Sequence, residues 1–442
     1  MRIKHTNNRS PKQEEPCTPA WQVPGQAGTL LFEEDPLTEA IRREIRRVVE
    51  MILREELQIA LGAKTYERMA QRCGYRNGSE ERQLTTSLGK TTLAVPRGRL
   101  FSHRDPEGGP QGKTAEWHSS LLPRYARRAK AVDDAILGLY LGGVNTRRIK
   151  VALKPLLRDA PLSKSTISRL VSRLKESFER WQSRSLQEEP LVYLYLDAVS
   201  VKVRVAGRVS SLPVLVALGV RPYRIPWEET GEKVLLELAL RGGESKEAWR
   251  GVLEGLVSRG LPTPRLIIAD GHPGLRAAIE ELWSGIDVQR CTVHKLRNLL
   301  AHAPRHAHDA VREDFHAMVY ADSLAEAQAA YQRFIRKWEK RCVGVVKSLL
   351  EADQEILTFY RYPGSHWKCL RTTNIIERLH GEFRRRVKTQ AALPSEGAVL
   401  MLLYGLMASG QIRLRRIDGW RDLPRVMATP VVLEMPMQMV AA

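Results

Sequence analysis

The feature that most constrains the fold is a change of hydrophobic period just after Pro190. Before it, apolar residues recur mostly at three- and four-residue spacing, which is typical of helices. After it, residues 191–220 read LVYLYLDAVSVKVRVAGRVSSLPVLVALGV, a nearly continuous apolar run broken at Ala206-Gly207. We expect two strands joined by a tight turn there. Pro213 cannot donate to a central ladder, so we expect an edge or a bulge at that point.

The next segment predicts an α/β core. Further strands are expected at 234–240, 265–270 and 286–291, with helices at 246–259 and after Gly271-His272-Pro273-Gly274. Three antiparallel strands followed by alternating helix and strand form a ribonuclease-H-like pattern. From Lys295 to Tyr362 the chain is predicted to be all helical, and two more helices are expected at 373–388 and 395–408.

The N-terminal third is predicted to be mostly helical with a small β element. We expect a helix over 35–72, a turn at 73–78, two short strands within 83–99, a loop at 101–116 and a helix over 121–141. Two short helices, 146–157 and 165–181, joined by a turn and basic at the second helix's start, suggest helix-turn-helix DNA binding. An ordinary helical hairpin with a solvated basic face is the alternative.

These patterns predict seven regions. They are a mobile N-terminal tail (1–30), a helical and β-hairpin region for DNA binding or dimerisation (31–118), a helix-turn-helix-like DNA-binding region (119–186), the first part of a ribonuclease-H-like catalytic core (187–299), an all-helical insertion (300–368), the last part of the core with the Glu377 helix (369–420), and a C-terminal tail (421–442).

The net charge of the chain narrows the range of expected binding partners. The 442 residues include 70 Lys plus Arg and 50 Asp plus Glu, a net charge of +20. Such an imbalance favours a polyanion, most often nucleic acid, over an anionic membrane or a ribosome. Five widely spaced cysteines form no disulfide framework. No apolar run reaches the ~20 residues of a membrane span, and the start lacks a signal-peptide core, so we expect an intracellular protein.

Two aspartates stand out in the predicted sheet. Asp197 lies within an apolar strand, where a carboxylate is costly unless it is paired or bound to a metal. An ion pair with Lys202 or Arg204 is the structural alternative. Asp270 ends a buried strand, where ligands bind in α/β sheets, although it could equally cap the following helix.

A glutamate on the 373–388 helix is the third candidate. Glu377 and Glu382 both lie on it, five positions apart, and either could instead pair with Arg378 or Arg386. Two Asp and one Glu meeting at a sheet edge would suit Mg²⁺ or Mn²⁺. Two such ions ~4 Å apart can support phosphodiester chemistry.

Cys291 and His294 form a C-x-x-H pair, which supplies two of the four ligands of structural zinc. Cys342, Cys369, His302 or His306 could complete such a site, but a buried thiol and a histidine that packs the site or contacts DNA is favoured. The basic run Arg384, Arg385, Arg386 and Lys388 predicts a phosphate-contacting surface or, alternatively, a solvated helix end.

Taken together, these residues resemble the mutator-type transposases of bacterial insertion sequences. The resemblance extends from about residue 35 to 415. Its landmarks are GYRNG (74–78), LTTSLGKTTLAVPRGR (84–99), GVNTRR (143–148), KSTISRL (164–170), YLYLDAVSVKVR (193–204), IIADGHPGL (267–275), QRCTVHKLRNLLAH (289–302) and TTNIIERLHGEFRRR (372–386).

The resemblance implies a DDE transposase with a ribonuclease-H-like core. It gives Asp197, Asp270 and Glu377 the metal-ligand places, prefers Glu377 over Glu382, and matches Cys291 and His294 to the family's C-x-x-H signature. The implied cofactor is Mg²⁺ or Mn²⁺, two ions. The implied partners are the element's terminal inverted repeats, target DNA and a second copy of the chain, with no membrane, in the cytoplasm with the nucleoid. The expected DNA contacts are Arg76, Arg147, Arg148, Lys164, Arg169, Arg384, Arg385, Arg386 and Lys388.

Two rival functions stay open at this point. One is a ribonuclease-H-fold nuclease that cleaves without strand transfer. The other is a catalytically inactive DNA-binding descendant of a transposase.

Overall fold

The structure of the chain is a computed structural model. It describes residues 36–428, except for 68, 70–71, 105–109, 145–147, 150–151, 154–162, 223–231 and 389–392. The chain divides into two compact units, residues 1–134 with 150–162 and residues 135–149 with 163–442. The predicted tail at 1–30 lies outside the described residues. None of the helices in the described ranges has the length and apolar character needed to cross a membrane.

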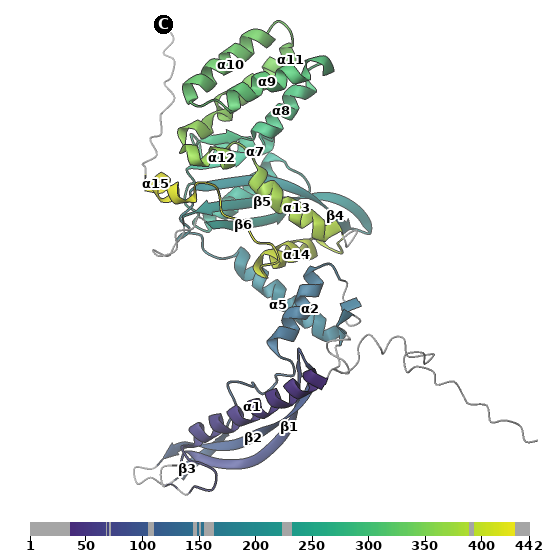
Figure 1. Ribbon diagram of the computed structural model, residues 1–442, viewed down its shortest axis with the longest axis vertical. Coiled ribbons are helices and arrows are strands. Elements are labelled where there is room, and N and C mark those ends of the chain that lie inside the picture. Colours follow the sequence, from purple (N-terminus) through teal and green to yellow (C-terminus); the bar gives the residue numbers. More distant parts are fainter. Residues whose placement is uncertain are drawn as a thin grey trace, which may run out of the picture. The chain divides into compact units, whose positions relative to one another are not determined.

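In the first unit, one long helix packs on a three-stranded antiparallel sheet (Figure 1). The helix is α1 (Pro36–Leu61), and the strands are β1 (Gly74–Thr86), β2 (Gly89–Arg104) and β3 (Pro110–Glu116). Leu53 of α1 is buried with Leu93, Val95 and Leu122 in a small core. The hairpin predicted within 83–99 is confirmed, since Thr86 pairs with Gly89.

Four predictions for the N-terminal third of the chain were wrong. The expected turn at 73–78 begins β1, and the expected loop at 101–116 contains the end of β2 and all of β3. The β2–β3 pairs, such as Arg99 with Glu116, join polar, Gly- and Pro-rich segments that show no apolar alternation. The helices were also predicted too long, because α1 ends at Leu61 and α2 (Lys130–Leu141) begins nine residues later than expected.

The second unit is built around a five-stranded sheet in the order β6-β5-β4-β7-β8. The strands are β4 (Tyr193–Val205), β5 (Arg208–Arg221), β6 (Glu232–Leu240), β7 (Leu266–Ala269) and β8 (Val288–Arg290). The first three are antiparallel neighbours, whereas β7 is parallel to β4 and β8 is parallel to β7. All five predicted strands are confirmed. Pro213 lies one residue beyond the first β5–β6 pair, Val214 with Leu240, as the expectation of a local edge requires.

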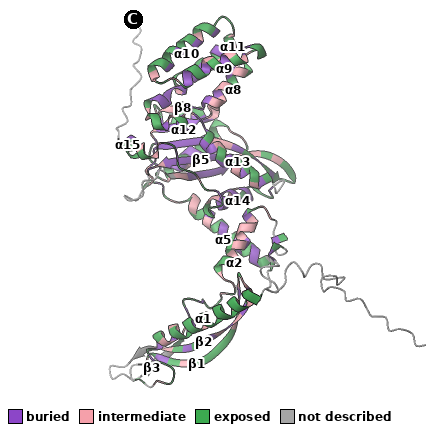
Figure 2. Ribbon diagram, in the orientation of Figure 1, coloured by how far each residue is buried: buried purple, intermediate pink, exposed green. Residues whose placement is uncertain are grey.

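Helices cover both faces of this sheet, so its strands are largely buried (Figure 2). On one face, α6 (Lys246–Ser258) and α7 (Pro273–Leu282) pack over a core that includes Leu194, Leu196 and Ile267. The other face carries Tyr193, Tyr195 and Ile268. It packs with α5 (Lys164–Gln182), α13 (Asn374–Lys388) and α14 (Glu396–Ala408). The mixed α/β class is therefore confirmed.

The helical segment predicted between Lys295 and Tyr362 is also confirmed. It contains α8 (Thr292–Ala301), α9 (His308–Val319), α10 (Leu324–Trp338) and α11 (Val343–Ala352), followed by short 3₁₀ turns. The short helices α12 (Trp367–Leu370) and α15 (Leu423–Ala428) complete the unit. Of the proposed helix-turn-helix, the second helix is α5, whereas the first lies largely outside the described residues.

Candidate active site

Asp197 and Asp270 come together through strand register. The parallel β4–β7 ladder ends with Leu196 opposite Ala269, so the two aspartates are the next residues on adjacent strands. Alternation along β4 puts Asp197 on the same face as Tyr195 and Val199, the face that α13 packs against. The Asp270 carboxylate accepts from the His272 backbone N–H at 2.9 Å, and the Asp197 carboxylate accepts from that of Ala198 at 2.9 Å.

Gly271 turns the chain directly after Asp270. Its φ of +86° lies in the left-handed region, and an added Cβ would meet the Arg290 guanidinium at 1.8 Å. The position therefore requires glycine.

Glu377 lies in the first turn of α13, where an acid interacts favourably with the helix dipole. The helix buries Ile376, Leu379 and Phe383, and this apolar face turns the glutamate toward a half-exposed position. The backbone N–H of Glu377 bonds to Thr373 O at 2.9 Å, so the threonine just before α13 also helps begin the helix.

Thr373 links Glu377 to the C-x-x-H pair. Its hydroxyl lies 3.1 Å from Glu377 Oε1, 3.2 Å from Cys291 Sγ and 3.5 Å from His294 Nδ1. Its backbone N–H adds a contact of 3.4 Å to the same sulfur. A hydroxyl has one hydrogen, so it donates to one of these acceptors at a time. Thr373 is fully buried, which gives the network a rigid centre.

Cys291 and His294 perturb each other. The hydrogen bond to Cys291 raises the pKa of His294 to about 9, against burial and with help from Glu377 and Asp197. Burial alone would raise the pKa of the Cys291 thiol, but hydrogen bonds from His294 and Thr373 outweigh it and the net shift is downward. His294 Nε2 also lies 3.6 Å from Glu377 Oε1.

Two residues of the site were missed from the sequence. His380, one turn after Glu377 on α13, is buried, and its Nδ1 lies 3.2 Å from Asp197 Oδ2. Its i+3 spacing from Glu377 is a signal that could have identified it. Glu244 follows β6, and its pKa is raised by burial and by the charges of Asp270 and Asp197. No local pattern marks this loop residue, because only the tertiary fold brings it to the aspartates.

One set of potential metal ligands lies close together. The ligand atoms of Cys291, His294 and Glu377 lie within 4.8 Å of one another, whereas the oxygens of Asp197, Asp270 and Glu377 do not form such a set within the described chain. None of the cysteines and histidines considered as further zinc ligands joins this group. Cys369, for example, is buried and donates to His366 O at 3.0 Å.

Glu382 has a different environment from Glu377. It forms ion pairs with Arg385, at 3.0 Å, and with Arg386. Its charge is thus balanced within α13. This agrees with the alternative that Glu382 is a surface acid paired with a nearby arginine.

The residues predicted to contact DNA are spread over both units. In the first unit, Arg76 is half-buried on β1 and donates to Ala63 O at 3.3 Å. In the second, Arg148 and Arg169 are exposed, as are Arg384, Arg385 and Lys388 on α13. Arg386 is half-buried. Arg147 and the side chain of Lys164 lie outside the described part.

The comparisons with known proteins all match one class of protein, the transposases. Residues 27–413 match the family described as "Transposase, Mutator family". The transposase for insertion sequence element ISRM5 of Rhizobium meliloti (strain 1021) is 36% identical, over 83% of this chain and 87% of that protein. That for IS406 of Burkholderia multivorans is 32% identical, over 82% and 88%. That for IS256 in transposon Tn4001 of Staphylococcus aureus is 32% identical, over 77% and 84%. The chain therefore belongs to the Mutator family of transposases, and the resemblance proposed from its motifs is confirmed.

Proposed function

We propose that the protein is a DDE transposase of an insertion sequence, which hydrolyses a phosphodiester at the element's end and joins the freed 3′-hydroxyl to another strand. The observation that carries this proposal is the register of Asp197 with Asp270 on the sheet face that α13 packs against. The sheet adds support, because three antiparallel strands followed by two parallel ones, each preceded by a helix, match a ribonuclease-H-like core.

We propose that Asp197, Asp270 and Glu377 hold Mg²⁺ or Mn²⁺, two ions. The donor set fits hard cations, since all three are carboxylates. Crowding of negative charge supports the fit, because Asp270 and Asp197 help to raise the pKa of the nearby Glu244. When bound, such ions activate the attacking oxygen and stabilise the leaving one.

The chain's own residues hold these carboxylates in place. Thr373, just before α13, and His294 on α8 constrain Glu377, and His380 constrains Asp197 from α13. We infer that the C-x-x-H pair acts here as a positioning element and not as a structural zinc site.

DNA would be held by the exposed cations of the second unit, by α5 as the second helix of a helix-turn-helix, and by the first unit. We infer that the bound DNA includes the terminal inverted repeats and the target. We also infer at least a dimer, because two ends must be processed together, acting on the nucleoid in the cytoplasm.

A cell-based excision assay tests the function. The gene is placed beside its native flanking DNA, and joined or circular ends are sought by amplification in wild type and in Glu377→Gln. We expect product only in wild type. Product in both would exclude the role of Glu377. Glu313→Gln, at an exposed glutamate on α9, is the matched control and should give product as wild type does. Cleavage without joined ends would instead favour the nuclease alternative, and no product in either would favour the inactive descendant.

A further inference from the structure

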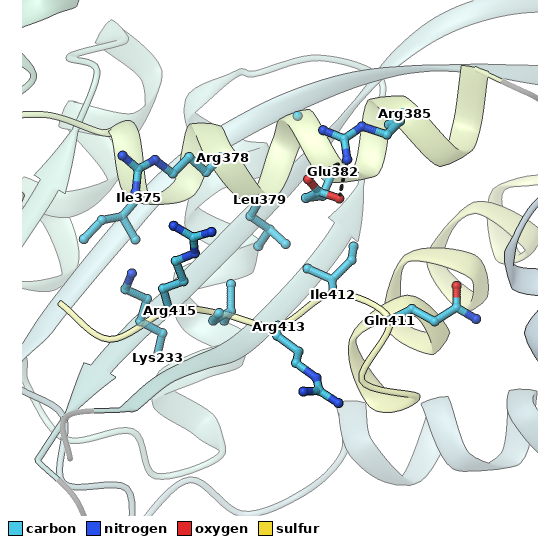
Figure 3. Close-up of a pocket in the computed structure, with 12 residues that line it drawn as sticks. Lys233, Ile375, Arg378, Leu379, Glu382, Arg385, Gln411, Ile412, Arg413 and Arg415 are labelled. Carbon is cyan, nitrogen blue, oxygen red and sulfur yellow. Dashed lines mark hydrogen bonds and ion pairs between the residues drawn. The ribbon is translucent and has the colours of Figure 1, made fainter. Parts of the chain in front are cut away.

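A second feature of α13 lies on the helix face next to that of Glu377. A cavity of about 630 Å³ lies between α13, β6 and the segment 411–415 that follows α14 (Figure 3). We call it the α13 basic groove. Its charged lining residues are Lys233, Arg378, Arg385, Arg413, Arg415 and Glu382.

Among the described residues, most of this positive charge has no acidic partner in an ion pair. Glu382 is paired with Arg385 and with Arg386, outside the groove lining. Within the described chain, no acidic side chain forms an ion pair with the other four cations of the groove. Burial lowers the pKa of Lys233, and the nearby charge of Arg378 lowers it further, opposed by Cys369 and Asp418. Gathering like charges in one cavity is unfavourable unless an anion occupies it.

The groove lies beside the candidate active site on the helix surface. Arg378 directly follows Glu377, and successive helical residues are turned by about 100°. Arg378, Glu382 and Arg385 recur at three- and four-residue spacing and therefore share one face, next to the face of Glu377. The groove is also lined by apolar side chains, among them Leu379 and Ile412. Cations from three separate elements along one channel suit a chain of phosphates better than a single small anion.

We propose that the α13 basic groove binds the phosphodiester backbone of DNA next to the scissile position. Arg378 comes from α13, and Arg413 and Arg415 come from the segment after α14, so the phosphates would lie between these two parts of the chain. This inference rests on the proposed function for the identity of the polyanion. It adds four cations that the sequence did not indicate, namely Lys233, Arg378, Arg413 and Arg415.

Salt-dependent binding tests the groove separately from catalysis. The double variant Arg413→Ala/Arg415→Ala of the full chain is titrated with a short DNA duplex of arbitrary sequence over a range of salt concentrations. Each lost phosphate contact makes the slope of log K against log salt shallower by about 0.9–1, so we expect a change of about 2. The charge-conserving Arg413→Lys/Arg415→Lys should keep the wild-type slope.

Lys340→Ala/Arg341→Ala is the matched control. Lys340 and Arg341 are exposed after α10 and do not line the groove. Replacing them removes the same net charge as the groove variant, so the slope of log K against log salt should not change. A wild-type slope in Arg413→Ala/Arg415→Ala, with an unchanged melting temperature, would overturn the inference. If Glu377-dependent excision is observed but the slope is unchanged, only the groove is wrong. If the slope changes as expected but wild type gives no excision, the groove stands and the proposed reaction is wrong.

Discussion

At the scale of single residues, the most informative side chain is Thr373. It is apolar on one side and hydroxylic on the other, and it is fully buried where α8 and α13 meet the candidate site. Its hydroxyl can donate to the Glu377 carboxylate while its backbone N–H donates to the Cys291 sulfur, so either group loses a hydrogen bond if it moves.

We therefore predict that Thr373→Val lowers metal-dependent cleavage by about 10–100-fold, the usual effect of losing a group that orients a metal ligand. Valine matches the shape of threonine, so the fold should persist. Thr373→Ser keeps the hydroxyl and should retain most activity. Cleavage rates over a Mg²⁺ titration measure the effect. Equal rates for Val and wild type would show that Thr373 does not position Glu377.

His380 supports a second prediction. It is buried beside Asp197, with Nδ1 at 3.2 Å from Oδ2. His380→Leu should reduce cleavage by about 10–100-fold, because the carboxylate loses an orienting donor. His380→Asn places an amide N–H near the position of Nδ1 and should restore part of the activity. Single-turnover rates compare the variants, and a Leu variant as active as Asn would contradict the positioning role.

At the scale of elements, different faces of α13 contact three different environments. Ile376, Leu379 and Phe383 are buried in the core, Glu377 lies in the candidate site, and Arg378 lines the basic groove. The helix α1 shows that a stripe can predict a helix without identifying its buried face. The spacing of Ile41, Ile45, Val48, Val49, Ile52 and Leu53 predicts α1, yet of these only Leu53 is buried and four are at least 40% exposed. The buried face is completed by Leu57 and Leu61.

The start of α7 gives a prediction about packing between elements. An added Cβ at Gly274 would lie 2.8 Å from both Glu244 O and Lys246 N, which are backbone atoms that cannot swing aside. Gly274→Ala should therefore destabilise the protein by about 1–3 kcal/mol. Gly255→Ala, in the interior of α6 with open space around it, should be neutral or slightly stabilising. Thermal unfolding of the two variants tests this prediction. Equal melting temperatures would contradict the close approach of Gly274 to the backbone at Glu244 and Lys246.

At the scale of the whole molecule, the proposed function gives separable roles to the net charge of +20 and to the acidic site. Binding to phosphates requires the cations alone, whereas the proposed reaction would require a divalent ion on the carboxylates. We predict that EDTA abolishes cleavage of end-containing DNA but leaves binding of the same DNA unchanged, and that added Mg²⁺ restores cleavage. Gel shift and cleavage run on one sample measure both. Cleavage that survives EDTA would exclude the metal-dependent reaction.

Local pattern alone was enough to predict most of the second unit. The alternation of 191–220, the buried run before Asp270 and the helical spacing of 373–388 each depend on residues close in sequence, so β4, β5, β7 and α13 were found with small errors at their ends. The β3 strand was missed because its pairing comes from backbone hydrogen bonds between polar segments, which leave no hydrophobic signal.

The candidate site, like the fold, could be predicted only in part from the sequence. The sequence by itself determined the family, the α/β class and which acids were worth considering, because a carboxylate inside an apolar strand is anomalous wherever the strand lies. Only the tertiary structure decided that Thr373 joins Cys291 to Glu377, that His380 faces Asp197, and that Lys233 and Arg415 line one groove. These contacts join residues dozens to nearly two hundred positions apart. Their formation depends on how helices pack over the sheet, which no local period encodes.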